Sequence, residues 1–419
     1  MVSGSALAAT KPAVGAAKGF QMTEVGLIPD EWDVVRIGDI GTVGRGRVIS
    51  HREILRSRNS LYPVYSSQTS NNGVMGYIDK FDFQGKYITW TTDGANAGTV
   101  FFRDGAFNCT NVCGTIKLDK HITEFVAIVL AKFAPKHVSR HLGNPKLMND
   151  VMKKIQIPVP RSKNEQIAIA KSLNDTDELI DSLERLIAKK RQIKQGVMQD
   201  LLSGKRRLAG YNDPWLEKSF GEIFDFLPTA TNPRSDLRED IGAYYVHYGD
   251  IHTRFHSHLN FRSQQPSRID LSKCKNAALL KNGDWIMADA SEDLDGVGKC
   301  IEIAGLGDGD QAVSGLHTFL LRERQSTFVH GFKGHLGNLK SLHEQYLRVM
   351  TGMKVFGVSK TALKGLILPI PSKDEQLQIT AILDEMEAEI CALENKVKKA
   401  RQCKKGMMQE LLTGRTRLT

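Results

Sequence analysis

Hydrophobic positions follow a heptad spacing in two long stretches of the chain, and this pattern predicts two long helices. Apolar side chains recur at alternating intervals of three and four residues in both stretches. A seam of this kind is narrow, so it favours pairing with another helix over burial in a broad core. We expect the two helices to pair through Leu173, Ile180, Leu183, Ile187, Leu383, Ile390, Leu393 and Val397.

The two stretches are copies of one segment. Residues 162–208 and 372–418 align without a gap, and nearly half of the aligned positions are identical. Each copy opens on Lys-x-Glu-Gln and closes on Gly-x-Met-Gln-x-Leu-Leu-x-Gly. A Pro-x-Pro sequence before each copy marks a helix start, and Gly204 and Gly414 are natural stops. The first helix, expected over 164–202, would be roughly 58 Å long at 1.5 Å per residue.

Charge predicts how the helices pair. The first half of each copy is acidic and the second half is basic. Antiparallel pairing sets acid against base, whereas parallel pairing would set like charges side by side. We therefore expect an antiparallel coiled coil, with two separate surface helices as the alternative. The seam weakens where Lys190, Lys194 and Lys404 fall on it, so the coil either splays there or meets another partner.

Two strand-rich bodies separate these helices, and we call them the first head and the second head. Short apolar runs alternate with Gly and Asn turns in both, for example KYITWTT and CGTIKL in the first and AYYVHYGDI and GDWIMADA in the second. One helix is expected in each head, over 122–133 in the first and 340–350 in the second. The two heads also open on similar sequences, which begin at Trp32 and at Trp215.

The predicted fold class is α+β, with two strand-rich globular domains joined by two long helices that form an antiparallel coiled coil, a pseudo-two-fold internal repeat. The expected domain limits are a flexible extension at 1–19, the heads at 20–160 and 209–371, and the helices at 161–208 and 372–419.

Composition adds an expected partner. The 419 residues are 41% hydrophobic and 25% charged, ordinary values for a chain of two or three domains. No apolar run approaches the 18 residues of a membrane span, and the Ala/Gly-rich first residues make a poor signal peptide, so a cytoplasmic protein without membrane contact is expected. The six scattered cysteines fit reduced thiols. A formal net charge of +10 favours a polyanionic partner.

Catalytic and cofactor signatures are incomplete. The Gly-Lys pairs at 85–86, 204–205 and 298–299 lack the Ser or Thr of a phosphate loop. The glycines at 41, 44 and 46 do not follow the strand of a βαβ unit, which a nucleotide site would require. Four histidines between His247 and His258 lack Cys or Glu at a recognised metal spacing. A polar loop that touches nucleic acid is the favoured interpretation of the histidines, with a solvated loop as the alternative, and no metal is expected.

Several loops combine amide, hydroxyl and basic side chains, the groups that read base edges or hold phosphates. Arg45 and Arg47 stand beside glycines that we expect to be flexible, which suits phosphate clamps. Ordinary turn chemistry is the alternative for each loop. The candidate DNA-contacting residues are Arg45, Arg47, Ser67, Gln68, Asn71, Asn72, Thr92, Asn96, Lys146, Tyr248, His252, Arg254, Ser291, Glu292, Lys354, Ser359 and Lys360.

The duplicated helix motifs, the opening GLIPDEW, and the head motifs TTDGANAG, YGDI and GLHTF resemble the specificity subunits of type I restriction-modification systems. The resemblance covers nearly the whole chain after Gly19, and it is most specific in the helices. It implies two target-recognition domains that each read one half of a split site in double-stranded DNA. It further implies that the paired helices act as a spacer and as a docking surface for two methyltransferase (modification) subunits.

The same resemblance implies that this chain is not an enzyme and binds no cofactor itself. S-adenosylmethionine would be used for adenine methylation by the partner modification subunits, and ATP with Mg by restriction/translocase subunits. The rival interpretations are a coiled-coil scaffold or adaptor without DNA readout, and a self-contained enzyme of an unrecognised type. Salt-dependent binding to duplex DNA separates the specificity subunit from the scaffold.

Overall fold

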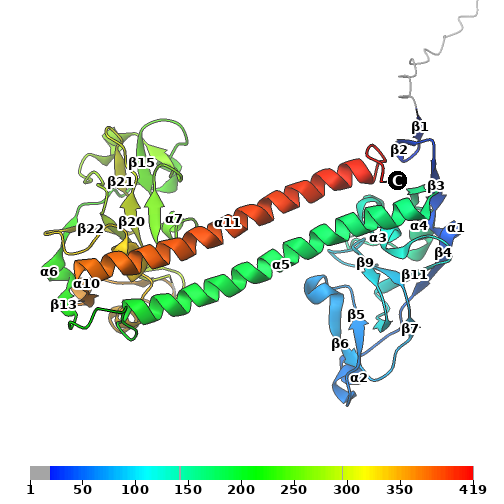
Figure 1. Cartoon of the computed structure of the whole chain (residues 1–419), viewed down its shortest axis with the longest axis horizontal. Coiled ribbons are helices and arrows are strands. Elements are labelled where there is room, and N and C mark those ends of the chain that lie inside the picture. The colour runs from blue at the N-terminus through cyan, green and yellow to red at the C-terminus, as the bar shows by residue number, and fades with distance from the viewer. Residues whose placement is uncertain (1–18, 141–142, 295, 419) are drawn as a thin grey trace, which may run out of the picture. The chain divides into compact units, whose positions relative to one another are not determined.

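The computed structural model describes residues 19–140, 143–294 and 296–418 and divides the chain into two compact units. The first unit comprises residues 1–183 and 396–419, and the second comprises 184–395. Residues 1–18 of the expected flexible extension lie outside the described residues. Each unit contains one head together with parts of both long helices (Figure 1).

Two four-stranded sheets build the first head. One has the order β4-β11-β8-β9 and is antiparallel throughout, and the other has the order β6-β5-β10-β7 with a parallel β5–β10 pair. The strands are β4 (Gly41–Arg45), β5 (Tyr62–Tyr65), β6 (Val74–Ile78), β7 (Phe83–Gln84), β8 (Tyr87–Thr91), β9 (Val100–Arg103), β10 (Ala106–Cys109) and β11 (Cys113–Leu118). The head also holds the hairpin β1 (Phe20–Thr23) and β2 (Gly26–Pro29), and the helices α2 (His51–Arg56) and α3 (Thr123–Phe133).

The second head repeats the central part of this topology, with one more strand in its larger sheet and one fewer in its smaller sheet. Its larger sheet has the order β14-β22-β18-β20-β16, and its smaller sheet has the order β17-β15-β21 with a parallel β15–β21 pair. The strands are β14 (Phe224–Leu227), β15 (Ala243–Val246), β16 (His258–Asn260), β17 (Arg268–Ile269), β18 (Trp285–Ala288), β20 (Cys300–Ala304), β21 (Ala312–Ser314) and β22 (Thr318–Glu323). A two-stranded sheet of β19 (Ala290–Ser291) and β23 (Phe356–Gly357), and the helices α7 (Tyr248–Thr253), α8 (Phe332–Leu336) and α9 (Lys340–Val349), complete it.

A tryptophan on the central strand anchors the core of each head. Trp90 on β8 and Trp285 on β18 are fully buried. In the first head the apolar face of α3 packs on β8 and β9, and in the second head α8 packs on β20. One expectation from the sequence was wrong in detail. The run AYYVHYGDI is a strand only to Val246, because the His247 side chain accepts a hydrogen bond from the Gly249 N–H and starts α7.

Short strand pairs connect each head to its long helix in the same way. In the first unit β3 (Trp32–Arg36) pairs antiparallel with β12 (Gln156–Pro160), and in the second β13 (Leu216–Ser219) pairs with β24 (Ile367–Ile370). A short helix follows the first strand of each pair and another precedes the second; these are α1 (Ile37–Ile40), α4 (Asn149–Lys154), α6 (Phe220–Ile223) and α10 (Lys360–Lys364). Since these elements recur, the sequence repeat is also a structural repeat.

The long helices confirm the predicted antiparallel coiled coil. The 40-residue α5 (Lys163–Leu202) and the 39-residue α11 (Lys373–Leu411) lie side by side and run in opposite directions (Figure 1). Every predicted seam residue is buried except Leu183, which is half-buried. Gly204 and Gly414, just beyond the helix ends, have φ of +70° and +67°, the left-handed conformation that favours glycine.

The lysines on the seam meet carboxylates of the opposite helix. Within the second unit Lys194 pairs with Glu387, and Lys190 Nζ lies 2.7 Å from Glu389 Oε1. Within the first unit Lys404 Nζ lies 2.6 Å from Asp177 Oδ2. Burial would raise the pKa of Glu387, but the Lys194 ammonium outweighs it and holds that pKa below its ordinary value. The acidic half of each helix therefore neutralises the basic half of the other, and the coil does not need to splay at these lysines.

The Glu and Gln of the Lys-x-Glu-Gln motif tie each helix start to its surroundings. Buried Glu165 accepts two hydrogen bonds from Arg417, which follows α11, with Arg417 Nη2 2.8 Å from Glu165 Oε2. Buried Glu375 accepts the equivalent pair from Arg207, which follows α5, at 2.8 and 2.9 Å. We call these two bidentate pairs the clasps. Each clasp joins the start of one long helix to the tail of the other.

Gln166 and Gln376 repeat a second set of bonds. Gln166 accepts a hydrogen bond from the backbone N–H of Ile122 in the first head, and Gln376 accepts one from that of Val329 in the second. Gln166 also donates to the carbonyl of Pro160, the last residue of β12, and Gln376 donates to the carbonyl of Pro371, the residue after β24. The glutamines thus fix the angle at which each head leaves its helix.

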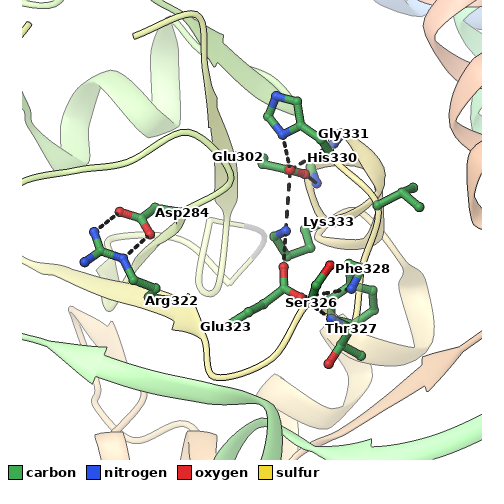
Figure 2. Close-up of polar contacts among 12 residues, drawn as sticks. Asp284, Glu302, Arg322, Glu323, Ser326, Thr327, Phe328, His330, Gly331 and Lys333 are labelled. Atoms are coloured by element: carbon green, nitrogen blue, oxygen red, sulfur yellow. Dashed lines mark hydrogen bonds and ion pairs between the residues drawn. The ribbon is translucent and has the colours of Figure 1, made fainter. Parts of the chain in front are cut away.

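A buried ionic network anchors α8 in the second head (Figure 2). Glu302 is fully buried, and its carboxylate accepts from the backbone N–H groups of Gly331 and Gly334, both at 2.9 Å. His330 Nδ1 lies 3.0 Å from the same carboxylate, and Lys333 Nζ lies 3.5 Å from it. Burial alone would raise the pKa of Glu302, but these partners lower it to about 2. Glu302 therefore stays ionised as the fixed point of the network.

Candidate nucleic-acid interface

Three loops at equivalent positions form one edge of each head. In the first head they are residues 66–73, 92–99 and 110–112, which follow β5, β8 and β10. In the second head they are residues 247–253, 289–294 and 315–317, which follow β15, β18 and β21. We call these sets the first loop edge and the second loop edge. Since the topologies match, the same strand ends present polar loops in both heads.

The same two backbone hydrogen bonds hold each loop edge together. In the first, Thr110 donates to Tyr65 at 2.8 Å and Thr92 donates to Val112 at 3.0 Å. In the second, Gly315 donates to Val246 at 2.9 Å and Asp289 donates to His317 at 3.1 Å. The loops of each edge are thus fixed to one another by the frame of the fold, and their side chains are free to differ.

Arg45, Thr92 and Lys146 come together at the first loop edge. Arg45 Nη2 lies 3.1 Å from Thr92 Oγ1 and 3.2 Å from Asp93 Oδ2, and Lys146 Nζ lies 3.9 Å from Asp93 Oδ1. Arg45 also donates to the Asn111 carbonyl, which fixes the third loop. Two cations share one carboxylate, so the cluster keeps a net positive charge. Thr92 is buried and serves as a partner of Arg45 within the cluster.

The glycines beside Arg45 and Arg47 are not flexible, which corrects an expectation from the sequence. Gly41–Arg45 is the strand β4, and a Cβ on Gly46 would lie 2.2 Å from the Cys109 carbonyl oxygen. Gly46 is therefore needed for close approach of two backbone segments. Arg47 is bound by Asp82 and Glu53, and the hydrogen bonds that it donates to Glu53 raise the pKa of the guanidinium further. A phosphate would have to compete with both carboxylates for Arg47.

Loop 66–73 presents two exposed asparagines. Asn71 and Asn72 have φ of 49° and 51°, a left-handed conformation that asparagine tolerates better than most residues. Gln68 donates to the Val74 carbonyl and so closes the loop, with Ser67 half-buried beside it. Asn96 is exposed in the neighbouring loop. The amides of Asn71, Asn72 and Asn96 are thus available to a ligand.

Tyr248, His252 and Ser291 come together at the second loop edge. The Tyr248 ring meets the His252 ring edge-on at 6.0 Å, and His252 Nε2 lies 3.2 Å from the Ala290 carbonyl oxygen. Ser291 is buried and bonds to Asp293, whereas Glu292 beside it is exposed. This edge carries imidazole and phenol groups where the first carries amides.

The remaining candidates of the second head lie outside these three loops, and several of them lie close by. Arg254 is bound to the Gln265 carbonyl and lies 3.8 Å from Asp250, and Ser359 caps α10. Lys360 Nζ lies 5.2 Å from the Phe226 ring centroid. Lys354 is exposed in the turn before β23, which pairs with β19 and so adjoins the second loop edge. Contact with DNA stays a prediction for every candidate in both heads.

One residue of the second loop edge and one beside the first were missed by sequence reasoning. His317 has φ of 57°, meets the Tyr248 ring at 5.4 Å and lies 3.3 Å from Asp289 Oδ1. Burial raises the pKa of Asp289 despite this histidine. The GLHTF motif was the signal for His317. In the first head, buried Arg103 lies 3.6 Å from the Tyr65 ring centroid, and nothing in its sequence context marked it.

Comparison with known proteins identifies a family by sequence. Residues 29–195 match a family model described as the type I restriction modification DNA specificity domain. A protein of Mycoplasma pneumoniae, named as the N-terminus of a candidate type I specificity subunit, is 45% identical over 136 residues, which is 32% of this chain and 72% of that protein. The specificity subunit of the type I restriction enzyme MpnII from the same organism is 40% identical over 131 residues, 31% of this chain but only 39% of that protein.

A solved structure shares the fold over nearly the full length. The S subunit of a type I restriction-modification system from M. genitalium aligns with a TM-score of 0.60 and 15% identity, covering 96% of this chain and 99% of that one. Among the described residues, no helix is long and apolar enough to cross a membrane.

Proposed function

Since the chain belongs to the family of type I restriction-modification specificity subunits, we propose that its two heads read the two halves of a bipartite site in duplex DNA. The observation that carries this proposal is the pair of matched loop edges. The two edges share the same backbone frame, including two equivalent backbone hydrogen bonds, while their side chains differ. A common frame with different side chains suits two readers of different base sequences.

The side chains of each edge suit a division between phosphate and base contacts. Arg45 and Lys146 carry the surplus positive charge that phosphates attract, and phosphate contacts position a protein without reading sequence. Asn71, Asn72 and Asn96 offer amides, which pair bidentately with adenine in the major groove. Tyr248, His252 and His317 offer donors and acceptors of another geometry at the second edge. The two half-sites are therefore expected to differ.

The coiled coil would fix the separation of the half-sites. A helix of 40 residues is about 60 Å long at 1.5 Å per residue. Ion pairs along the seam and a clasp in each unit hold α5 and α11 in one register. A stiff spacer of this kind allows only certain distances between the two blocks of bases that are read.

The repeat also suits docking of two copies of one partner. Ile167 and Leu377 occupy equivalent positions near the starts of α5 and α11, and they are 47% and 55% exposed. Two equivalent apolar contacts would let two modification subunits bind in the same way. Those subunits would use S-adenosylmethionine, and restriction subunits would use ATP and Mg. The specificity chain itself carries out no catalysis.

Selection from a random duplex library tests the proposal. The chain, assembled with its modification subunits, would be incubated with the library at several salt concentrations, and the bound DNA sequenced. We expect two blocks of fixed bases separated by a constant number of unspecified pairs, with affinity that falls as salt rises. Asn96→Ala should change one block and leave the other intact. Binding without any enriched sequence would instead support the coiled-coil adaptor.

A further inference from the structure

Two histidines and a carboxylate meet where the second head contacts α11. His258 begins β16, His335 lies in α8 and Asp384 lies in α11. One nitrogen or oxygen atom from each residue lies within 4.8 Å of the others. His335 Nε2 is 2.7 Å from Asp384 Oδ1, and the ring centroids of His258 and His335 are 4.9 Å apart.

The two imidazoles can offer nitrogen ligands to a cation. His335 is 1% exposed, and its Nδ1 has no hydrogen-bond partner among the described residues. Burial lowers the pKa of His258, and the neighbouring His335 lowers it further. Neutral imidazole nitrogens and a carboxylate oxygen are common ligands of Zn²⁺.

Two glycines leave space for these side chains. A Cβ on Gly334 would lie 2.4 Å from His258 Nε2. A Cβ on Gly331 would lie 2.9 Å from a methyl of Thr380 on α11, with His258 Nε2 at 3.8 Å and Asp384 Oδ2 at 3.9 Å. His258 Nε2 and Asp384 Oδ2 thus approach the same point beside Gly331, and any larger residue there would separate them.

We propose that His258, His335 and Asp384 form a binding site for a divalent transition-metal ion of the Zn²⁺ class that fastens the second head to α11. A tetrahedral ion with bonds of about 2.0–2.2 Å separates its ligand atoms by roughly 3.3 Å. The three ligand atoms lie within 4.8 Å of one another, so they would have to move closer together, and the 54% exposed side chain of Asp384 leaves room for such a movement. Water fills the fourth position. When the ion binds, the contacts of His258 Nε2 with the Gly331 carbonyl and of His335 Nε2 with Asp384 are replaced by bonds to the ion, and each neutral ring carries its proton on Nδ1.

The ion would join three elements that are distant in the sequence. β16 and α8 belong to the second head, while α11 belongs to the spacer, so the bound ion stiffens the point where they meet. The site has no counterpart in the first copy of the repeat, because Asn174 stands at the position equivalent to Asp384 and offers no carboxylate. The inference goes beyond DNA reading and does not depend on it.

Titration of the reduced, metal-free full chain with Zn²⁺, followed by calorimetry, tests the site. We expect one ion per chain, at least tenfold weaker binding in Asp384→Asn and in His258→Gln, and a higher unfolding temperature of the wild type with Zn²⁺. Asp384 is largely exposed, so its substitution tests the site without disturbing a buried core. His256→Gln removes an exposed histidine two residues away and should leave binding unchanged.

Substitution of Co²⁺ identifies the ligand atoms. Visible absorption of a tetrahedral ion without a thiolate charge-transfer band supports nitrogen and oxygen ligands. A thiolate band would place the ion at the exposed Cys391 or Cys403 and overturn the proposal. Absence of binding by the wild type, or equal binding by the wild type and Asp384→Asn, would show that the cluster is only a hydrogen-bonded tether.

Discussion

Residues other than glycine adopt left-handed backbone conformations in both loop edges. Asn71 and Asn72 have positive φ in the first edge, and His317 does in the second. This conformation costs roughly 1–2 kcal/mol for an ordinary residue, although asparagine tolerates it. Such strain is typical of binding sites, where the fold holds a side chain in a position it would not otherwise take.

Asn72→Gly separates base reading from backbone strain. Glycine accepts the left-handed conformation, so the substitution removes only the amide. We expect the discrimination between bases to fall by about 1–3 kcal/mol at one base pair of one half-site. The free energy of unfolding measured in urea should stay unchanged. Asn72→Ala should relax the same position and also lower stability by roughly 1 kcal/mol. Library selection and urea unfolding measure the two effects. Equal losses at both half-sites would point to a different reading surface.

The ionisation of Glu302 makes the free energy of unfolding of the second head depend on pH. Its pKa of about 2 in the folded chain lies below the ordinary 4.5, so its contribution is fully present above about pH 4.5 and is lost as pH falls toward 2. At pH 7 the contribution is on the order of 3 kcal/mol. We expect Glu302→Gln to lose this stability at pH 7 and to show a flatter acid dependence.

Hydrogen exchange of peptides from β20 and α8, measured in urea with a metal chelator present, follows this transition. The exposed Glu239 supplies the matched control, since Glu239→Gln removes the same charge without a buried network. An unchanged acid dependence in Glu302→Gln would show that another group governs the stability of this region.

The clasps give the repeated helix motifs a structural role. Glu165 and Glu375 are each 1% exposed, and each takes a bidentate pair from an arginine that follows the opposite helix. Bidentate arginine–carboxylate pairs are geometrically specific. An antiparallel partner in the correct register is required to complete them. The clasps therefore select both the direction and the register of the coil.

Arg417→Ala tests the clasp of the first unit. The substitution leaves the Glu165 carboxylate buried without its main partner, and breaking a buried ion pair in this way costs about 3–5 kcal/mol. We expect a loss of that size for the first unit in urea unfolding. Arg415→Ala is the matched control, because Arg415 lies two residues away and its side chain makes no closer ion pair among the described residues than a 3.9 Å contact with Glu410. Similar losses in both variants would contradict a specific clasp.

The sequence was sufficient for elements whose signal is periodic or local. The heptads predicted the seam, and Gly204 and Gly414 marked the helix ends. The acidic first half and basic second half of each helix predicted the antiparallel direction. The clasps were not predicted, because a motif at a helix start gives no indication of a partner more than 150 residues away. His258, His335 and Asp384 were missed for the same reason, since the histidines near 247–258 suggested only local neighbours.

The candidate site was predicted only in part. Sequence composition identified the loops that carry amides and hydroxyls, and the fold gathers most of them at two equivalent edges. The sequence could not show that Thr92 and Ser291 are buried, or that Arg47 is held by two carboxylates. These outcomes depend on which strand ends become neighbours, and that is a property of the sheet topology.

The two halves of the chain carry equivalent clasp partners. Arg207 follows α5 as Arg417 follows α11, and both face a glutamate at the start of the opposite helix. A fragment of residues 1–208 retains one head, Glu165 and Arg207. We expect it to form a symmetric dimer, with Arg207 of each copy bound to Glu165 of the other, and to select a palindromic split site.

Sedimentation equilibrium of this fragment measures its association. Arg207→Ala should weaken the dimer, and Arg206→Ala should not, because Arg206 makes no side-chain contact to a glutamate among the described residues. A folded fragment that stays monomeric at high concentration would contradict the interchange.

The spacing imposed by the coil is the central claim for the whole molecule, and a change in coil length tests it. Seven residues inserted after Leu183 and seven after Leu393 preserve the heptads, so the seam closes while the coil lengthens by about 10 Å. That length matches roughly three base pairs. The insertion rotates the heads by only about 20°, whereas three base pairs rotate the grooves by about 100°. Distance and phase therefore cannot both be met without twisting the DNA.

The most direct measurement is the spacer length selected from a random duplex library by the assembled complex, with and without these insertions. We predict that the lengthened chain folds, loses affinity for the original site, and prefers a longer spacer only weakly, while both half-site sequences stay the same. An unchanged affinity together with an unchanged spacer would show that the helices do not set the distance between the two heads.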